Sequence, residues 1–285
     1  MTQVDDRVRV APPMRQADLS GKVLLVTGAS AGIGAACARE AVQRGANVVL
    51  VARRAERVAA LAAELGSSAL GVAGDVTRDG DIARAVALGR ERFGGLDVLL
   101  ANAGFGVSGD FVSLTLDDYR RQFETNVFGA MRSLYEALPE LEKRRGAVGV
   151  VGSVNGYVSI PGWSAYCMSK HALRSFCASV RLELRERGVS VTHLAPGFVE
   201  TEFRRVDNAN KHHPDVSDPT PSFLLLSAER AAREMLDATV ARRAEAVITL
   251  HGKAAVGLAR HTPGVVSLAL SLGGDITRRL SKRPA

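Results

Sequence analysis

Short apolar runs alternate with amphipathic stretches along most of this chain, and the alternation limits the folds that it can adopt. The first pair is the apolar run KVLLVTG (22–28) and the helix-like stretch AGIGAACAREAVQRG (31–45), which closes with a glycine. Helices that connect neighbouring strands imply right-handed crossovers between parallel strands. Strands covered by helices on both faces are apolar along their whole length, as this run is. The pattern predicts an α/β fold with a doubly wound, mostly parallel sheet.

The same alternation continues to residue 196 and then becomes less regular. Further strands are expected at 47–53, 68–76, 96–104, 147–153 and 189–196, with helices at 54–66, 78–94, 116–143 and 164–187. A helix at 227–243 starts with a serine cap, and a last strand is expected at 245–250. Because no proline-rich or serine-rich linker divides these elements, we expect one domain over residues 19–250.

Three segments lie outside the alternation. Residues 1–18 are polar, contain two prolines and predict a flexible N-terminal arm. Residues 200–226 are irregular and contain three prolines. Long irregular segments in compact domains are often functional, so we interpret this one as a substrate loop or lid, with a disordered surface loop as the alternative. Residues 251–285 predict a helical C-terminal extension.

The net charge raises the question of nucleic-acid binding, since it is +7 with a sequence pI of about 9.7. Lys and Arg are interleaved with Asp and Glu, whereas a nucleic-acid surface needs a basic stripe with aromatic side chains between the charges. Aromatic residues make up only 5% of the chain. We therefore expect a small-molecule substrate and no nucleic-acid partner.

The cysteines and histidines suggest no metal site. Cys37, Cys167 and Cys177 fit no disulfide or zinc spacing and are expected to be buried. His171 and the pair His212–His213 have no carboxylate or cysteine partner at ligand spacing. An odd number of unpatterned cysteines is typical of the reducing cytoplasm, which is the expected location.

The ends of the chain bear on its relation to membranes. The first residues carry charges where a signal peptide needs an apolar run, which also favours a cytoplasmic protein. The apolar stretch 254–274 is interrupted by Arg260, His261 and Pro263. Neither half is long enough to span a bilayer, so no transmembrane segment is expected, while peripheral contact with a membrane surface stays open.

A glycine-rich turn, TGASAGIG from Thr27 to Gly34, joins the first strand to the first helix. Glycine lets a backbone turn sharply and approach a phosphate without a Cβ between them. The N-terminus of the helix then offers N–H groups and a positive dipole end to a pyrophosphate. A tight turn alone could need the same glycines, but its place after the first strand of a doubly wound sheet favours a dinucleotide site.

The end of the second strand bears on which dinucleotide binds. NAD binders carry an acidic residue there that accepts hydrogen bonds from the adenine ribose, but this chain has Ala52 followed by Arg53 and Arg54. Guanidinium groups bind phosphate well, and Ser30 of the glycine loop can add a hydrogen bond. We predict NADP(H) in preference to NAD(H). The alternative is that both arginines only begin a solvated helix.

Several further motifs follow the glycine loop 27–34 along the chain. They are Asp75-Val76, the segment ANAG (101–104), Asn126, Ser153, Tyr166, Lys170 and the loop PGFVET (196–201). With these motifs in this order, the sequence resembles the short-chain dehydrogenase/reductase family over residues 19–201. Ala101 departs from the family's motif, which has Asn first. The resemblance implies a Rossmann-like fold and a nicotinamide cofactor bound by Thr27, Gly28, Ser30, Gly32, Ile33, Gly34, Arg53, Arg54, Asp75, Val76, Asn102, Ala103, Gly104, Tyr166, Lys170, Pro196, Gly197, Val199 and Thr201.

Tyr166, Lys170, Ser153 and Asn126 match the catalytic residues of that family. Tyrosine has a pKa near 10 and is a poor base at neutral pH. A lysine beside it favours the phenolate and brings it closer to the working pH. Ser153 can stabilise charge on the substrate oxygen, and the resemblance implies that Asn126 holds a water that links Lys170 to solvent. Taken singly, each residue could have an ordinary structural role.

The substrate and the partners are less constrained by the sequence. We expect Ser153, Asn155, Trp163, Tyr166 and Phe198 to contact the substrate, and Phe105, Tyr157, Phe203, Phe223 and Leu224 are further candidate walls. These side chains predict a lipophilic ketone or secondary alcohol. A non-catalytic NADP-binding regulator on the same fold is the alternative function. The resemblance also implies a homodimer or homotetramer formed through the long helices at 116–143 and 164–187.

Overall fold

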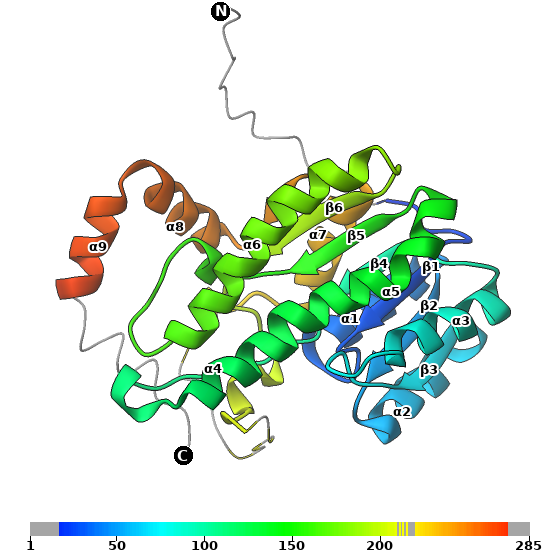
Figure 1. Ribbon diagram of the computed structural model, residues 1–285, viewed down its shortest axis with the longest axis horizontal. Helices are drawn as coiled ribbons and strands as arrows, with labels where there is room; N and C mark the ends of the chain where they lie inside the picture. The colour runs from blue at the N-terminus through cyan, green and yellow to red at the C-terminus, as the bar shows by residue number, and fades with distance from the viewer. Residues whose placement is uncertain (1–16, 210, 212, 214, 216–219, 273–285) are drawn as a thin grey trace, which may run out of the picture.

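A seven-stranded parallel sheet with helices on both faces forms the centre of the molecule (Figure 1). The computed structural model describes residues 17–209, 211, 213, 215 and 220–272. The strand order is β3-β2-β1-β4-β5-β6-β7. The strands are β1 Val23–Thr27, β2 Asn47–Ala52, β3 Ala69–Ala73, β4 Val98–Ala101, β5 Ala147–Val151, β6 Ser190–Ala195 and β7 Glu245–Val247. The predicted doubly wound, parallel α/β fold is confirmed.

Apolar side chains on both faces of the sheet explain why its central strands are apolar throughout. All five residues of β1 and of β5 are buried. One core lies between the sheet and α1 (Gly32–Gln43), α2 (Ala55–Leu65) and α7 (Ala228–Val240). The other lies between the sheet and α3 (Asp81–Phe93), α5 (Gly129–Arg144) and α6 (Ser164–Arg185). Each of the strands β1 to β6 therefore contributes side chains to both cores.

The order of the strands positions the site. After β3 the chain crosses to the other side of β1 and forms β4, so the connections from β1 and β4 leave in opposite directions. Such a switch point leaves a crevice at the carboxyl ends of the strands, where ligands bind in open α/β sheets. The β1–α1 turn, which contains the glycine loop, lies at this crevice.

The sequence predicts one continuous helix at 116–143, and this prediction is wrong in the middle of the segment. The segment consists of α4 (Leu116–Phe123), a π-helical turn over Glu124–Phe128 and α5. A π turn holds one more residue than an α turn and is frequent at functional sites. Here it contains Asn126, whose side chain bonds the backbone of Phe105 and fixes the turn.

The predicted last strand is also shorter than expected. It ends at Val247, and Thr249 instead caps α8 (Leu250–His261) by accepting a hydrogen bond from the backbone N–H of Gly252 at 3.2 Å. The helix α9 (Pro263–Leu272) follows. No helix in the described ranges is long and apolar enough to cross a membrane.

The described residues of the segment 200–226 include two short 3-10 helices, and the two ends of the segment are joined. Glu200 N–H donates to Leu226 O at 2.9 Å, and Leu226 N–H donates to Phe198 O at 3.0 Å. Within it, the short 3-10 helix η5 (Glu202–Arg205) lies beside the crevice. Residues 1–16 of the expected arm and 273–285 of the expected extension lie outside the described residues.

Candidate active site

One pocket of about 870 Å³ occupies the crevice at the carboxyl ends of the strands. It is lined by the glycine loop, by the ends of β2, β4 and β5, and by η5 and α8. Of the predicted site residues, those on its wall are Gly28, Ser30, Gly32, Ile33, Arg53, Arg54, Asp75, Val76, Asn102, Ala103, Gly104, Ser153, Asn155, Trp163, Tyr166, Lys170, Pro196, Gly197, Phe198, Val199 and Thr201.

The glycine loop is packed too closely for side chains at two positions. A Cβ on Gly28, where φ is +66°, would lie 2.8 Å from the Ala103 Cα, and one on Gly34 would lie 2.4 Å from the Gly28 carbonyl oxygen. Thr27 accepts hydrogen bonds at its Oγ1 from the N–H groups of Asn102 and Ala103, at 3.0 and 3.1 Å. Thr27 and Gly34 thus shape the loop from behind and do not line the pocket.

A cluster of arginines lies at one end of the pocket, next to the glycine loop. Arg54 donates to the hydroxyl of Ser30 from Nε at 3.2 Å and from Nη2 at 3.0 Å. Burial and the neighbouring Arg57 lower the pKa of Arg54. Crowded guanidinium groups beside a hydroxyl form a site suited to a phosphate. We refer to this end as the arginine end.

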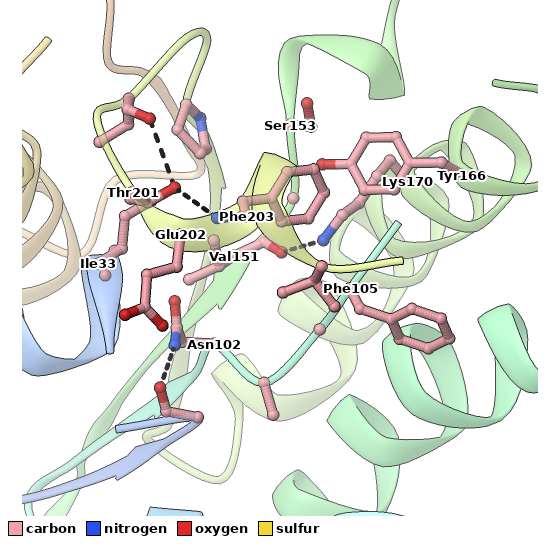
Figure 2. A pocket seen from close by; sticks show the side chains of 18 of the residues that line it. Ile33, Asn102, Phe105, Val151, Ser153, Tyr166, Lys170, Thr201, Glu202 and Phe203 are labelled. Carbon is pink, nitrogen blue, oxygen red and sulfur yellow. Dashed lines mark hydrogen bonds between the residues drawn. The ribbon is translucent and has the colours of Figure 1, made fainter. Parts of the chain in front are cut away.

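The carboxylate of Glu202 is held at the arginine end. It accepts two hydrogen bonds from Arg57 Nη1, at 2.9 and 3.1 Å, and lies 3.6 Å from Arg54 Nη1. Glu202 and Phe203 are neighbours on η5 but point in different directions in the pocket (Figure 2). The sequence analysis did not select Glu202 or Arg57, although Glu202 directly follows Thr201.

Tyr166 and Lys170 extend from one face of α6 into the middle of the pocket (Figure 2). Lys170 Nζ lies 5.5 Å from the centre of the Tyr166 ring and donates to the carbonyl oxygen of Val151 at 2.8 Å. Burial lowers the pKa of Lys170 to about 8. The helix therefore brings the phenol and the ammonium together, as the spacing of four residues predicts.

Ser153 stands at the end of β5, opposite α6. Its Oγ accepts a hydrogen bond from the N–H of Asn155 at 3.1 Å, which orients the hydroxyl. The pocket brings Ser153, Tyr166 and Lys170 together.

Asn126 is buried behind the loop that follows β4, here called the β4 loop, and does not line the pocket. Its amide group donates to Phe105 O at 3.0 Å and to Ser169 Oγ at 3.2 Å, while its Oδ1 accepts from Phe105 N–H at 3.1 Å. These bonds connect the π turn, the β4 loop and α6. Its expected part in a water-mediated proton path stays a prediction.

Aromatic rings form the other end of the pocket, which we call the aromatic end. Trp163 meets Tyr166 edge to face with ring centres 5.6 Å apart and stacks on Phe203 at 6.4 Å. Phe198 stacks on His251 at 5.4 Å. The guanidinium of Arg204 lies between these groups. Asn155, Phe105 and Phe203 line the pocket as predicted, whereas Tyr157, Phe223 and Leu224 do not.

The reasons for those differences are local. Tyr157 turns away from the pocket to form a 3.1 Å hydrogen bond with His193, and Phe223 is 84% exposed on the surface. Arg204, His251 and Ala255 also line the pocket and were not predicted from the sequence. No local motif marks the latter two, because α8 reaches the pocket only through the tertiary fold.

Comparisons with known proteins agree with this arrangement. A family model described as short chain dehydrogenase matches residues 22–212. The serine 3-dehydrogenase of Agrobacterium fabrum is 37% identical over 189 residues, 66% of this chain and 76% of that protein. The mouse dehydrogenase/reductase SDR family member 7B is 35% identical over 196 residues, 66% of this chain and 61% of that protein.

Solved structures show the same fold. A short chain dehydrogenase/reductase from Burkholderia phymatum, in complex with NAD, has a TM-score of 0.75 at 25% identity and covers 85% of this chain and 94% of its own. An alcohol dehydrogenase from Thermococcus sibiricus, complexed with 5-hydroxy-NADP, has a TM-score of 0.70 at 27% identity and covers 80% and 96%. Fold and crevice define a dinucleotide-binding α/β protein. The chain belongs to the short-chain dehydrogenase/reductase family of oxidoreductases.

Proposed function

We propose that the protein is an NADP(H)-dependent oxidoreductase that moves a hydride between nicotinamide and a carbonyl compound or secondary alcohol. The observation that carries the proposal is the meeting of Tyr166, Lys170 and Ser153 in the pocket that also contains the glycine loop. A site that only bound a dinucleotide would have no chemical need for this set. The nicotinamide supplies or accepts the hydride, and the side chains handle the proton.

In the reduction direction, the Tyr166 phenol donates a proton to the substrate oxygen. The Lys170 ammonium favours the phenolate that remains, because opposite charges stabilise each other at short range. With a pKa of about 8, Lys170 carries its charge at neutral pH. Since Ser153 Oγ accepts a hydrogen bond from Asn155 N–H, its own proton can be donated to the substrate oxygen. In the oxidation direction the phenolate removes the alcohol proton.

The preference for NADP(H) rests on the arginine end of the pocket. Arg53, Arg54 and the hydroxyl of Ser30 would hold the 2′-phosphate of the cofactor, and Ala52 stands at the end of β2 where NAD binders carry an acidic residue. The two solved relatives are complexes with NAD and with 5-hydroxy-NADP, so the proposed preference rests on this chain's own residues. The glycine loop would receive the pyrophosphate.

Tyr166→Phe tests the proposed reaction. The variant keeps the ring and loses the proton donor, so we expect unchanged NADPH binding and a loss of kcat of about a hundredfold or more. The rate is measured as NADPH oxidation with ketones, aldehydes and oxo acids, and NADPH binding by fluorescence. Serine is an alcohol, so it is tested in the opposite direction, as NADP+ reduction; it is included because the name of one relative contains it. Substantial turnover by the variant, or tighter binding of NADH than NADPH by the unmodified protein, would contradict the proposal.

A further inference from the structure

The turn that begins with Ser153 packs against the C-terminal helix α8. Ser153 is followed by a 3-10 turn over Val154–Gly156 and then by Tyr157, and we call residues 153–157 the serine turn. A Cβ on Gly252 of α8 would lie 2.8 Å from the Val154 side chain. Because Gly252 has no side chain, the backbone of α8 lies directly against the serine turn.

Tyr157 connects the far end of the serine turn to two helices. The Cζ of Arg174 on α6 lies 4.2 Å from the centre of the Tyr157 ring, and the Cζ of Arg260 on α8 lies 5.2 Å from it. Aromatic rings attract guanidinium groups at such distances, and the attraction is stronger where the groups are partly desolvated. Tyr157 is partly buried, so both contacts stabilise its position.

The hydroxyl of Tyr157 has a partner in the sheet. It lies 3.1 Å from Nδ1 of His193 on β6, and the His193 ring also packs against Gly152, the residue before Ser153. Burial and the neighbouring carboxylate of Glu245 raise the pKa of Tyr157, so the phenol stays neutral. The serine turn is therefore fixed at both of its ends by neighbouring elements.

Glu245 orients the two arginines that contact Tyr157. Its carboxylate, at the start of β7, is bonded to Nη2 of Arg260 and lies 3.7 Å from Nε of Arg174. The Glu245 side chain is 26% exposed, so salt screens these ion pairs less than pairs on the open surface. The charge of Glu245 thus keeps Arg260 beside the Tyr157 ring.

We propose that α8 fixes the position of the Ser153 hydroxyl and that Arg260 is a positioning residue, which acts on Ser153 through Tyr157 and the serine turn. Ser153 lies at the end of β5 whereas Tyr166 lies on α6, so their relative position depends on contacts between elements. Misplacement of a reacting group by about 1 Å can lower a rate by about a hundredfold. The inference rests on the proposed oxidoreductase function and assigns the C-terminal helix a part in the same site.

Hydrogen exchange tests this link without any turnover. The N–H groups of Gly156 and Tyr157 donate to Ser153 O and Val154 O at 2.9 Å, so their exchange reports how often the serine turn opens. Arg260→Met keeps an unbranched side chain and removes the guanidinium. We expect exchange in residues 153–157 of the full-length protein to become about three- to tenfold faster in this variant, and exchange in α2 to stay unchanged. Mass spectrometry measures both, and unchanged exchange in the serine turn would overturn the proposal.

A matched control separates this contact from the general effect of removing a charge from α8. Lys253 is exposed on the same helix and does not line the pocket. Lys253→Met should leave exchange in the serine turn unchanged. Equal acceleration in Lys253→Met and Arg260→Met would also overturn the proposal.

A double-mutant cycle tests the effect on the reaction. The constants kcat and KM are measured with NADPH and acetophenone for Arg260→Met, Ser153→Ala and the double variant. Arg260→Met should lower kcat by about tenfold with little change in KM or in the Kd of NADPH, and should have little further effect in the Ser153→Ala background. Arg260→Lys should recover part of kcat, because it keeps the charge beside Glu245. Equal losses of kcat in both backgrounds would refute an action through Ser153.

The two proposals fail in different ways. Equal losses in both backgrounds, or unchanged hydrogen exchange, would refute the positioning role while the oxidoreductase function stands. Absence of turnover on every carbonyl compound would count against the oxidoreductase function. Hydrogen exchange would then still decide whether Arg260 of α8 holds the serine turn.

Discussion

Lys170 combines deep burial with a positive charge, which is a costly arrangement for a single residue. The residue is 5% exposed, and its ammonium donates a hydrogen bond to the carbonyl oxygen of Val151. Transfer of a charged amine from water into the protein is unfavourable, which is why the pKa falls to about 8. The fold tolerates this cost at the position where the proposed chemistry needs a cation.

The burial of Lys170 predicts a specific dependence of stability on pH. Below pH 8 the lysine is charged in both states, and above about 10.5 it is neutral in both. Between these values the unfolded state binds the extra proton, so the free energy of unfolding rises with pH across this window. Denaturant unfolding of the unmodified protein and of Lys170→Met at pH 7.5 and 9.5 measures the effect. A rise of the same size in the variant would show that other groups cause it.

Glu202 predicts an effect on cofactor choice. Its carboxylate lies 3.6 Å from Arg54 and opposes an incoming 2′-phosphate, so Glu202→Gln should tighten NADPH binding several-fold and change NADH binding much less. Fluorescence titrations with both cofactors measure the difference. Glu200→Gln, an exposed change nearby on the same segment, is the control. Equal changes for NADPH and NADH would mean that Glu202 does not face the phosphate.

Residue spacing shows which parts of the site were predictable. The pair Tyr166 and Lys170 could be predicted because an α-helix places residues four apart on one face. Glu202 and Arg204 could not, because their directions depend on a four-residue 3-10 helix inside an irregular segment. The sequence shows that both residues are charged, but it does not show which end of the pocket each side chain reaches.

At the scale of elements, the contact between the end of β5 and β6 leaves no room beside Ser153. His193 of β6 is buried, and its Nδ1 lies 3.1 Å from the Tyr157 hydroxyl. A Cβ on Gly152 would lie 2.0 Å from His193 Nε2. Because Gly152 has no side chain, β5 and β6 can pair while the His193 ring fills the space between the end of β5 and Tyr157.

Gly152→Ala should therefore lower the free energy of unfolding by about 1–3 kcal/mol, because the added methyl group displaces the His193 ring. Gly257→Ala is the matched control, since Gly257 lies in α8 and an added Cβ would meet nothing within 4 Å. That change should be neutral or stabilise the helix by about 0.5–1 kcal/mol. Chemical denaturation compares the three proteins. An unchanged midpoint for Gly152→Ala would mean that His193 can move without cost.

The elements themselves were predictable to different degrees. Buried strands and amphipathic helices have strong periodic patterns, and most of their ends lie within a few residues of the prediction. The π turn at Glu124–Phe128 has no such pattern. It depends on hydrogen bonds from Asn126 to the backbone of Phe105, in the loop that follows β4. Thr249 was predicted to lie in the last strand. An apolar run in the sequence does not show where strand pairing ends and the N-terminal cap of the next helix begins.

At the scale of the whole molecule, the C-terminal helices extend from the side of the sheet that carries β7, away from α2 and α3 (Figure 1). Two residues of α8, His251 and Ala255, reach the wall of the pocket. The expected extension thus closes one side of the site. The contact of α8 with the pocket could not be inferred from composition, because it joins residues that are far apart in sequence.

The exposed surface of the long helices predicts self-association. Leu116 of α4, Tyr135 of α5 and Leu182 of α6 are 72%, 69% and 57% exposed. We expect a homodimer or homotetramer formed through these helices, as proposed from the family resemblance, because association would bury such side chains. Light scattering of the full chain should give a mass above that of one chain. Tyr135→Glu should shift the mass toward the monomer, while Leu88→Glu on α3 should not; a monomeric unmodified protein would contradict the expectation.

The position of η5 has a consequence for how the two ends of the pocket act on each other. Four consecutive residues, Thr201 to Arg204, line the wall, with Glu202 bound at the arginine end and Arg204 at the aromatic end. A cofactor phosphate that disturbs the bonds of Glu202 would therefore also move Arg204. Thermodynamic linkage then requires reciprocity: whatever factor the cofactor applies to the affinity for a ligand at the aromatic end, that ligand applies to the affinity for the cofactor.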